Sequence, residues 1–181
     1  KNFTGTLMLP ESLQYIGASA FHHCSGITGS LKIPQGITEI SSFAFYGGGF
    51  DGALIMHDGL IAIGERAFGL CKFKGELNLP SKIFILEDEV FINCNFSGNL
   101  KLPQNLRSIG MSVFENNVRL SGILEFPPSV TSISAGAFAR CGFEEIIFPE
   151  NLEYIGYIDS YPGGAFANCF NVGRIVCKGT I

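Results

Sequence analysis

Cysteine is the residue type whose spacing most invites a chemical role in this chain. Five of the six cysteines recur at one position of a repeated pattern, and the roles to test are metal ligand and nucleophile. Zinc needs four converging ligands, usually with short C-x₂-C pairs, which the sequence lacks. A Cys–His pair at His23–Cys24 fails because neighbours in sequence point in different directions. The repeated position instead predicts a column of small buried side chains: Cys24, Cys71, Cys94, Cys141 and Cys169.

A disulfide is the third role open to these cysteines. Cys71/Cys94 and Cys141/Cys169 fall on adjacent repeats, close enough for a bridge by Cα distance. Both thiols of such a pair would point the same way into one packed column, which disfavours bonding between them. We expect free thiols, with these two bridges as the alternative.

Histidines, acidic residues and one glycine-rich run complete the chemical candidates. Gly47–Gly52 resembles a calcium-binding nonapeptide but occurs once, whereas that site needs neighbouring turns to share an ion. Glu87–Glu89 stands where other repeats have a turn glycine, so we expect a solvated turn. The histidines are expected on surface turns: His22, His23 and His57. We therefore expect no catalytic residues, no metal and no cofactor.

These residues sit on a repeat of about 23 residues. A phenylalanine recurs with steps of 24, 23, 23, 23, 24 and 28, at Phe21, Phe45, Phe68, Phe91, Phe114, Phe138 and Phe166. A proline recurs about twelve residues upstream, except in the third repeat, where His57 replaces it, and in the last, where an insertion lengthens the interval. Residues 1–181 are predicted to be one domain of seven repeats, as a piece of a longer array. The repeats are 2–24, 25–48, 49–71, 72–94, 95–117, 118–141 and 142–169, and 170–181 is either the start of a further strand or the C-terminal end of the array.

Each repeat predicts the same short elements. An alternating Leu-x-Leu run before the proline indicates a strand, and a second short strand follows it. A glycine at the next position is predicted to adopt positive φ, at Gly17, Gly64, Gly110 and Gly156. The Ala-Phe-x-x-Cys segment then predicts one turn of 3₁₀ or α helix. A single repeat cannot bury its own Leu, Ile and Phe, so neighbours must stack.

The run at 24–34, CSGITGSLKIP, continues to Ile40 and Ala44–Phe45 and resembles the BspA-type leucine-rich repeats of bacterial cell-surface proteins. The resemblance covers essentially the whole chain. It implies a right-handed β/α horseshoe arc, mostly of short parallel strands, located at the cell surface or secreted. It also implies adhesion or binding of a protein ligand, such as a host matrix or partner-cell protein, without catalysis. The alternatives are a carbohydrate-binding module and a structural spacer.

Composition excludes two classes of partner. The 12 Lys and Arg residues are scattered singly against 16 Asp and Glu, so the basic stripe that nucleic acid requires is missing. No run of about 20 apolar residues is present, so the sequence predicts no membrane-spanning helix.

Departures from the repeat mark the candidate binding residues. Ile55 on the first strand, and Ile61, Phe84 and Ile85 on the second, are apolar where the pattern expects polar residues. The alternative for them is packing against a neighbouring domain. In the last repeat an insertion carries two tyrosines and an acid, and such insertions often map to a binding face. Its alternative is a tolerated surface loop; the candidates are Tyr157, Asp159 and Tyr161.

Overall fold

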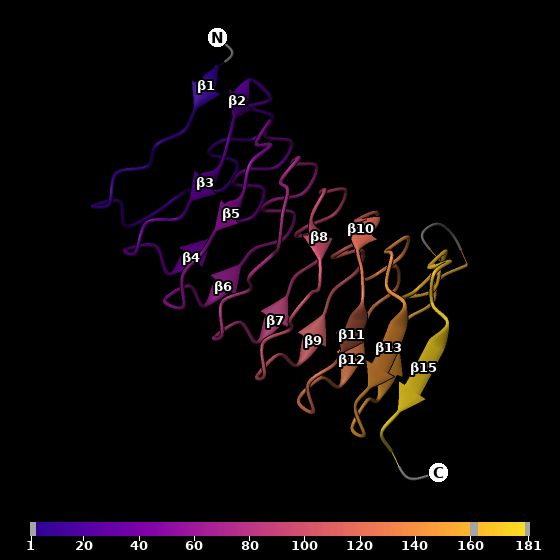
Figure 1. Ribbon diagram of the computed structural model, residues 1–181. Helices are drawn as coiled ribbons and strands as arrows, with labels where there is room; N and C mark the ends of the chain where they lie inside the picture. Colours follow the sequence, from indigo (N-terminus) through magenta and orange to yellow (C-terminus); the bar gives the residue numbers. More distant parts are fainter. Residues whose placement is uncertain (1–2, 160–162, 180–181) are drawn as a thin grey trace.

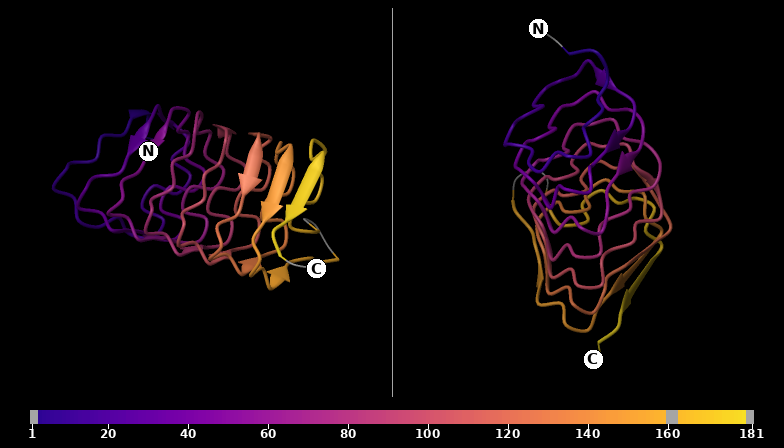
Figure 2. Two further views of the ribbon diagram at one scale, coloured as in Figure 1. Left: turned by 60° about the horizontal axis from the view of Figure 1, so that its bottom comes forward. Right: turned by 90° about the vertical axis from the view of Figure 1, so that its left-hand side faces the viewer.

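The computed structural model describes residues 3–159 and 163–179, which form an elongated stack of coils, one for each predicted repeat. Successive coils lie side by side from the N-terminal to the C-terminal end (Figure 1). Seen along the stack, they overlap around a shared interior (Figure 2, right). The described residues contain fifteen short strands, and every strand pair is parallel. The predicted parallel-strand repeat solenoid is therefore confirmed. Below, the coils are numbered one to seven in the order of the repeats.

The first strand column contains the segments that lead into the proline position. β3 (Leu31–Lys32) pairs with β5 (Leu54–Ile55), and an isolated bridge joins Asn78 to Lys101. Towards the C-terminal end the sheet contains β11 (Ile123–Glu125), β13 (Glu145–Phe148) and β15 (Arg174–Cys177). Side chains alternate, so Leu31 and Leu54 are buried while Lys32 and Ile55 face outward.

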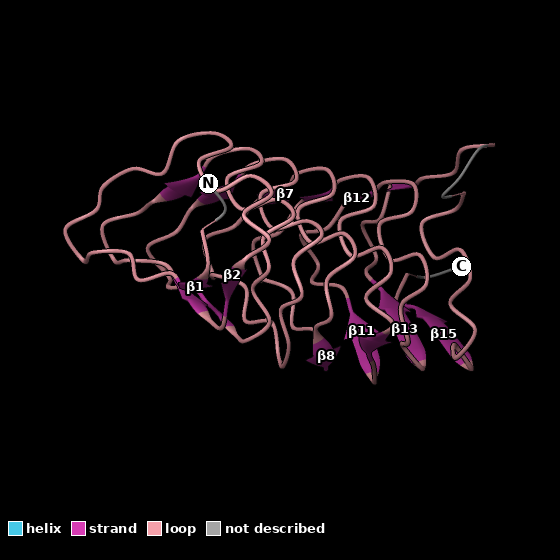
Figure 3. Cartoon of the chain, turned by 90° about the horizontal axis from the view of Figure 1, so that it is seen from above, coloured by secondary structure: helices cyan, strands magenta, loops and turns pink. Residues whose placement is uncertain are grey.

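The second strand column follows the proline turn on a different side of the coils. Figure 3 shows β7 and β12 along one side of the stack, with β11, β13 and β15 along the other. β4 (Glu39–Ile40) pairs with β6 (Ala62–Ile63). A four-stranded sheet contains β7 (Ile85–Leu86), β9 (Ser108–Ile109), β12 (Ser132–Ile133) and β14 (Tyr154–Ile155). From coil two onward, each coil thus contributes one short strand to each column, with one exception. In the first column, coils four and five are joined only by the single bridge between Asn78 and Lys101.

Two further strand pairs lie where the coils begin. β1 (Gly5–Thr6) pairs with β2 (Ile27–Thr28), and β8 (Ser97–Gly98) pairs with β10 (Arg119–Leu120). The expected strand at Leu7–Leu9 is not formed.

Phenylalanine ladders fill the interior. The rings at the repeated position stack coil on coil, with centroids 5.3 to 5.8 Å apart and nearly parallel planes. The five interior rings are fully buried, while Phe21 and Phe166 at the ends are half-buried. A second ladder, Phe50, Phe73 and Phe96, meets the first edge to face. Each buried ring contributes about 1.5 to 3 kcal/mol, and each aromatic pair about 0.5 to 1.5 kcal/mol more.

The predicted helical turn in Ala-Phe-x-x-Cys is not formed, because the described residues contain no helix. In coil two the N–H groups of Phe43, Phe45 and Gly47 donate to carbonyl oxygens of coil three. The N–H groups between them donate within the coil to the residue three positions earlier. Phe43 and Gly47 have left-handed φ values of 59° and 67°, which interrupt any right-handed helix. The segment is therefore a ladder of turns shared between coils, and the β/α description is corrected.

The prediction of positive φ at the repeated glycine is also wrong. Gly17, Gly64, Gly110 and Gly156 all lie outside the left-handed region. A Cβ on Gly64 would come within 2.6 Å of the Ser42 backbone nitrogen of the coil before it. At Gly64, Gly110 and Gly156 the missing side chain lets two coils approach closely, whereas Gly17 has no such close neighbour. After Gly17, Gly64 and Gly110 the left-handed residue comes two positions later, at Ser19, Arg66 and Ser112.

Candidate functional site

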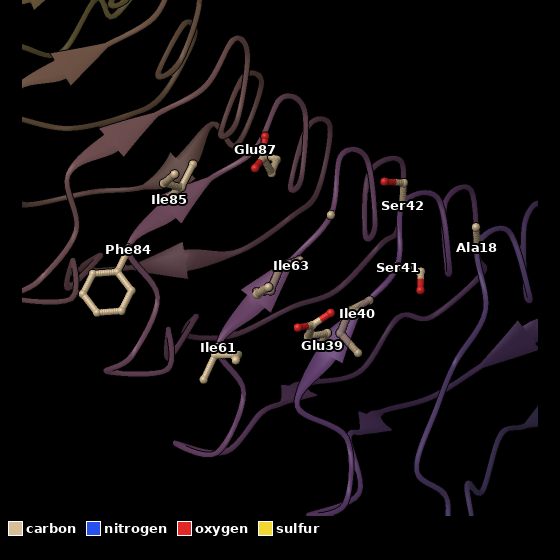
Figure 4. Close-up of a pocket in the computed structure, with 12 residues that line it drawn as sticks. Ala18, Glu39, Ile40, Ser41, Ser42, Ile61, Ile63, Phe84, Ile85 and Glu87 are labelled. Carbon is tan, nitrogen blue, oxygen red and sulfur yellow. The ribbon is translucent and has the colours of Figure 1, made fainter.

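A groove of about 500 Å³ crosses the second strand column of the first four coils (Figure 4). We call it the Phe84 groove. β4, β6 and β7 supply its floor, and the turns after them supply one wall. Its lining residues are Ala18, Glu39, Ile40, Ser41, Ser42, Ile61, Ala62, Ile63, Gly64, Phe84, Ile85 and Glu87.

Strand alternation explains why apolar side chains face this groove. Ile63 and Leu86 point into the core, so the residue before each of them in the same strand, Ala62 or Ile85, points outward. The residue before each strand, Ile61 or Phe84, is also exposed: Ile61 by 45%, and Phe84 and Ile85 by 50% each. The next two coils place polar residues at the same positions: Arg107, Ser108, Thr131 and Ser132. The apolar patch is therefore a local feature of coils three and four.

Small side chains make the hollow. Ala62 lies between Glu39 and Ile85 in the outward position of the column, and its methyl group fills less space than either neighbour. Ser42 and Gly64, in the adjoining turns, also have small side chains or none, so they fill little of the groove. Figure 4 shows Phe84 and Ile85 on one coil and Ile61 on the next, with Glu39 near Ile61 and Glu87 near Ile85.

The charge of the Phe84 groove is wholly acidic. None of its twelve lining residues is Lys or Arg. Neither Glu39 nor Glu87 forms an ion pair within the described part of the chain. A ligand that buries apolar surface here would therefore also lie beside two unpaired carboxylates.

The other predicted binding residues lie away from this groove. Ile55 is 48% exposed, but it belongs to β5 in the first strand column and does not line the groove. Tyr157 and Asp159 are exposed in the loop after β14, in the last coil. Tyr161 lies outside the described residues. The structure thus brings together Ile61, Phe84 and Ile85, and leaves the tyrosine loop as a separate surface.

Sequence reasoning missed the contribution of Glu39, Glu87 and the small residues. Glu87 was expected to lie in a solvated turn, and its proximity to Glu39 depends on how coils two and four align. It also missed an aromatic cluster on the turn side, in which the ring of His22 stacks on Tyr46 with centroids 5.5 Å apart. Alignment of the repeats would have placed these two rings in one column.

Arg66 extends this turn-side cluster. Its guanidinium lies 5.4 Å from the ring centre of Phe43, and its Nε donates to Glu89 Oε2 at 2.8 Å. The hydrogen bond to Glu89 is the main reason that the pKa of Arg66 is raised. The guanidinium of Arg66 therefore pairs with Glu89 and packs on Phe43, and we assign it a structural role.

The cysteine column has no feature of a reactive thiol. All six cysteines are free, and Cys71, Cys94 and Cys141 are buried. Burial raises the pKa of Cys71 to about 12 and those of Cys94 and Cys141 well above the usual value, whereas a reactive cysteine has a lowered pKa. Each thiol donates to the carbonyl oxygen of a phenylalanine in the preceding coil, as Cys71 does to Phe45 at 3.1 Å. We assign the column a packing role.

Two other kinds of site were sought among the described residues. No group of three or more His, Cys, Asp or Glu side chains gathers there in a way that could hold a metal ion. None of the described segments is a helix of the length and apolarity needed to cross a bilayer.

Comparison with solved structures shows the same fold in two bacterial proteins. A leucine-rich repeat protein from Bacteroides ovatus is 19% identical, with a TM-score of 0.62 over 97% of this chain. The chain spans 55% of that protein's length. The T. pallidum Leucine Rich Repeat protein is 21% identical, with a TM-score of 0.59 over 85% of this chain and 72% of its own. No curated protein sequence is significantly similar.

Comparison with protein families settles the assignment. The model described as BspA type Leucine rich repeat region (6 copies) matches residues 2–121 and 52–173. These two overlapping matches cover nearly the whole chain and include every coil that lines the Phe84 groove. The family supports a role in protein interaction or as a structural repeat. The chain therefore belongs to the BspA-type leucine-rich repeat family.

Proposed function

We propose that this chain is a non-catalytic module, displayed at a bacterial cell surface, that binds a protein ligand through the Phe84 groove. The single observation that supports this function is the exposure of Ile61, Phe84 and Ile85 together, on adjoining coils, in a groove of about 500 Å³. Solitary exposed apolar side chains are ordinary, but a contiguous group rimmed by polar residues marks an interaction surface. A host matrix protein or a partner-cell protein would supply the ligand.

A protein ligand fits this groove better than a glycan. Glycan sites usually present coplanar aromatic rings, and Phe84 is the one aromatic residue of the lining. The floor is otherwise aliphatic, which suits apolar side chains of a peptide segment. In a structural spacer these outward positions need not be apolar. Coils five and six, for example, have Ser108 and Ser132 at the position of Ile85.

The tyrosine loop is proposed as a second contact surface. Tyr157 is 66% exposed, and tyrosine supplies large contact area at low cost in conformational entropy. Tyr157 and Asp159 are exposed in the loop after β14, so a ligand can contact them without disturbing the stack. Tyr157→Ala is expected to weaken binding less than changes in the groove.

The test is panning of a random-peptide display library, followed by binding of the selected peptides to three forms of the protein. These are the unaltered chain, an Ile61→Ser/Phe84→Ser/Ile85→Ser variant and a Ser108→Ala/Ser132→Ala variant. We expect loss of binding only in the first variant, because the second alters the same column in coils five and six, at residues that do not line the groove. Circular dichroism checks that both variants fold. Equal binding to all three forms would refute the groove, and a signal confined to a glycan array would refute the protein ligand.

A further inference from the structure

The strand columns are not continuous beneath the Phe84 groove. In the second column, Ile61 N donates to Thr38 O and Arg107 N donates to Phe84 O, both at 2.8 Å. No backbone hydrogen bond of this kind joins Phe84 to Ile61, so the ladder of described residues stops between β6 and β7. The groove therefore lies over a seam between coils three and four.

The same seam interrupts the first strand column. β5 pairs with β3, and the next link joins Asn78 to Lys101, so nothing pairs Ile55 with Asn78. From coil two onward, every other pair of neighbouring described coils keeps a strand contact in at least one column. Coils three and four are joined instead by their turns, as in Phe68 N to Val90 O at 3.1 Å, and by Lys72 and Lys74 at the coil start.

An open seam matters because it lets the groove admit a side chain. β6 and β7 share no backbone hydrogen bond, so a small local separation of Ile61 and Phe84 breaks none between these strands, while the turn and coil-start bonds still join coils three and four. Local opening is easiest where few such bonds must break. An apolar side chain placed between them would contact both and cover part of their exposed surface.

Charge indicates which apolar segment fits. Glu39 of coil two and Glu87 of coil four line the groove together with its apolar side chains, and no Lys or Arg is among the lining residues. An acidic segment would meet two like charges, whereas Lys or Arg next to the apolar residue would pair with them. The aliphatic stems of Lys and Arg also pack well on apolar surface.

We infer that the ligand of the Phe84 groove is an extended segment of a partner protein in which a large apolar residue is flanked by Lys or Arg. The apolar residue lies on Ile61, Phe84 and Ile85 at the seam, and the flanking cations pair with Glu39 and Glu87. This inference rests on the proposed function and names the chemistry of its ligand.

The test uses three fluorescent peptides, capped at both ends, and the whole chain. The first has the core Lys-Leu-Lys-Phe-Lys, the second replaces each Lys by Glu, and the third replaces Leu and Phe by Ser. Anisotropy titrations at low salt and at about 0.5 M salt measure the affinities. We expect the first peptide to bind about tenfold more tightly than either other peptide at low salt, with the advantage over the acidic peptide largely lost at high salt.

Matched variants assign the effect to residues. Glu39→Gln/Glu87→Gln is expected to weaken the first peptide about three- to tenfold at low salt. Glu153→Gln, which alters an exposed carboxylate of the same column in the last coil, is expected to change nothing. Phe84→Ser is expected to weaken the first and second peptides alike, because it removes apolar contact.

Hydrogen exchange supplies an independent readout. The amides of Phe84 and Glu87 lack the coil-to-coil bonds that Arg107 and Gly110 make, so they are expected to exchange faster and to slow when the first peptide binds. The inference is overturned if the acidic peptide binds as tightly as the basic one, or if Glu39→Gln/Glu87→Gln has no effect while Phe84→Ser does. In that case the proposed function stands. If neither these peptides nor the library peptides depend on the groove, the proposed function itself fails.

Discussion

The side-chain amide of Asn117 donates a hydrogen bond to the backbone carbonyl oxygen of Phe91, one coil earlier, at 2.8 Å. It makes a second bond to Phe114 O at 3.0 Å. Elsewhere in the column the donor is a thiol, as in Cys94 Sγ to Phe68 O at 3.3 Å. From coil three onward this repeat position therefore holds a small donor that reaches the preceding coil, and a thiol and an amide both serve.

Asn117 fills this position imperfectly, and a substitution to cysteine is expected to improve it. Among the described side chains, Asn117 Oδ1 is buried without a hydrogen-bond partner, which costs about 1 to 3 kcal/mol. Asn117→Cys removes this acceptor and keeps a donor for Phe91 O, so the free energy of unfolding should rise by about 1 kcal/mol. Asn117→Ala should lower it, because Phe91 O loses its donor. Urea unfolding measures both, and a less stable cysteine variant would contradict the account.

The repeated glycine offers a comparison within one position. A Cβ on Gly110 would lie 2.8 Å from the Asp88 backbone nitrogen, whereas a Cβ on Gly17 would find Tyr15 as its nearest contact at 3.6 Å. Gly110→Ala should therefore destabilise the fold by about 1 to 3 kcal/mol through overpacking of two coils. Gly17→Ala should be neutral or slightly stabilising. Thermal unfolding of the two variants decides between close approach and a backbone-angle requirement, which would penalise both equally.

Leu70 occupies a left-handed position with φ of 57° and is exposed. Asparagine tolerates this conformation better than leucine and fills the same position at Asn93 and Asn116, whose side chains bond to each other at 2.7 Å. Leu70→Asn is expected to raise the free energy of unfolding by about 0.5 to 1 kcal/mol. Leu70→Val should lower it, because a branched Cβ suits positive φ least. Urea titration tests the order Asn, Leu, Val; any other order would show that packing of Leu70 outweighs its backbone angle.

The buried thiols predict how stability changes at high pH. The pKa of Cys71 is raised from 9.0 to about 12 by burial. Below pH 9 the thiol is protonated in both the folded and the unfolded state, so its full contribution to stability is present. Between about pH 9 and 12 the unfolded thiol ionises first, and stability falls as pH rises.

Replacing Cys71 by valine should make this fall shallower, while Cys177→Ala, at an exposed cysteine, should leave it unchanged. Urea midpoints at pH 8, 10 and 11 provide the measurement. Equal slopes for the unaltered chain and Cys71→Val would show that other groups control alkaline unfolding.

Much of the fold could be predicted because each coil contacts only its neighbours. The spacing of Phe45, Phe68 and Phe91 gives the ladder directly, since equal steps place equal residues above one another. The turn segment could not be predicted in the same way. Phe-x-x-Cys spacing suits a helical turn, but every second N–H is used by the next coil, and the left-handed residues Phe43 and Arg66 give no sign of their backbone angle in their side chains.

Part of the candidate site could also be predicted from the repeat pattern, and part could not. The apolar departures at Ile61, Phe84 and Ile85 stand out against the repeat, and their outward direction follows from strand alternation. Ile55 lies on β5 in the first strand column, the separate strand that its place in the repeat predicts. The tyrosine loop is a separate surface because it lies in the last coil, whereas the groove is formed by the first four coils.

The repeat alone predicts the register, the core ladders and which side chains face outward, because a fixed period turns local position into coil-to-coil contact. The folded chain is needed to show that Glu39 and Glu87 line the same groove as the apolar side chains and that the strand ladder stops between β6 and β7. Both depend on how the backbones of successive coils fit together. The packing of successive coils depends on the side-chain volumes and hydrogen bonds of several coils together, so it cannot be predicted from any single repeat.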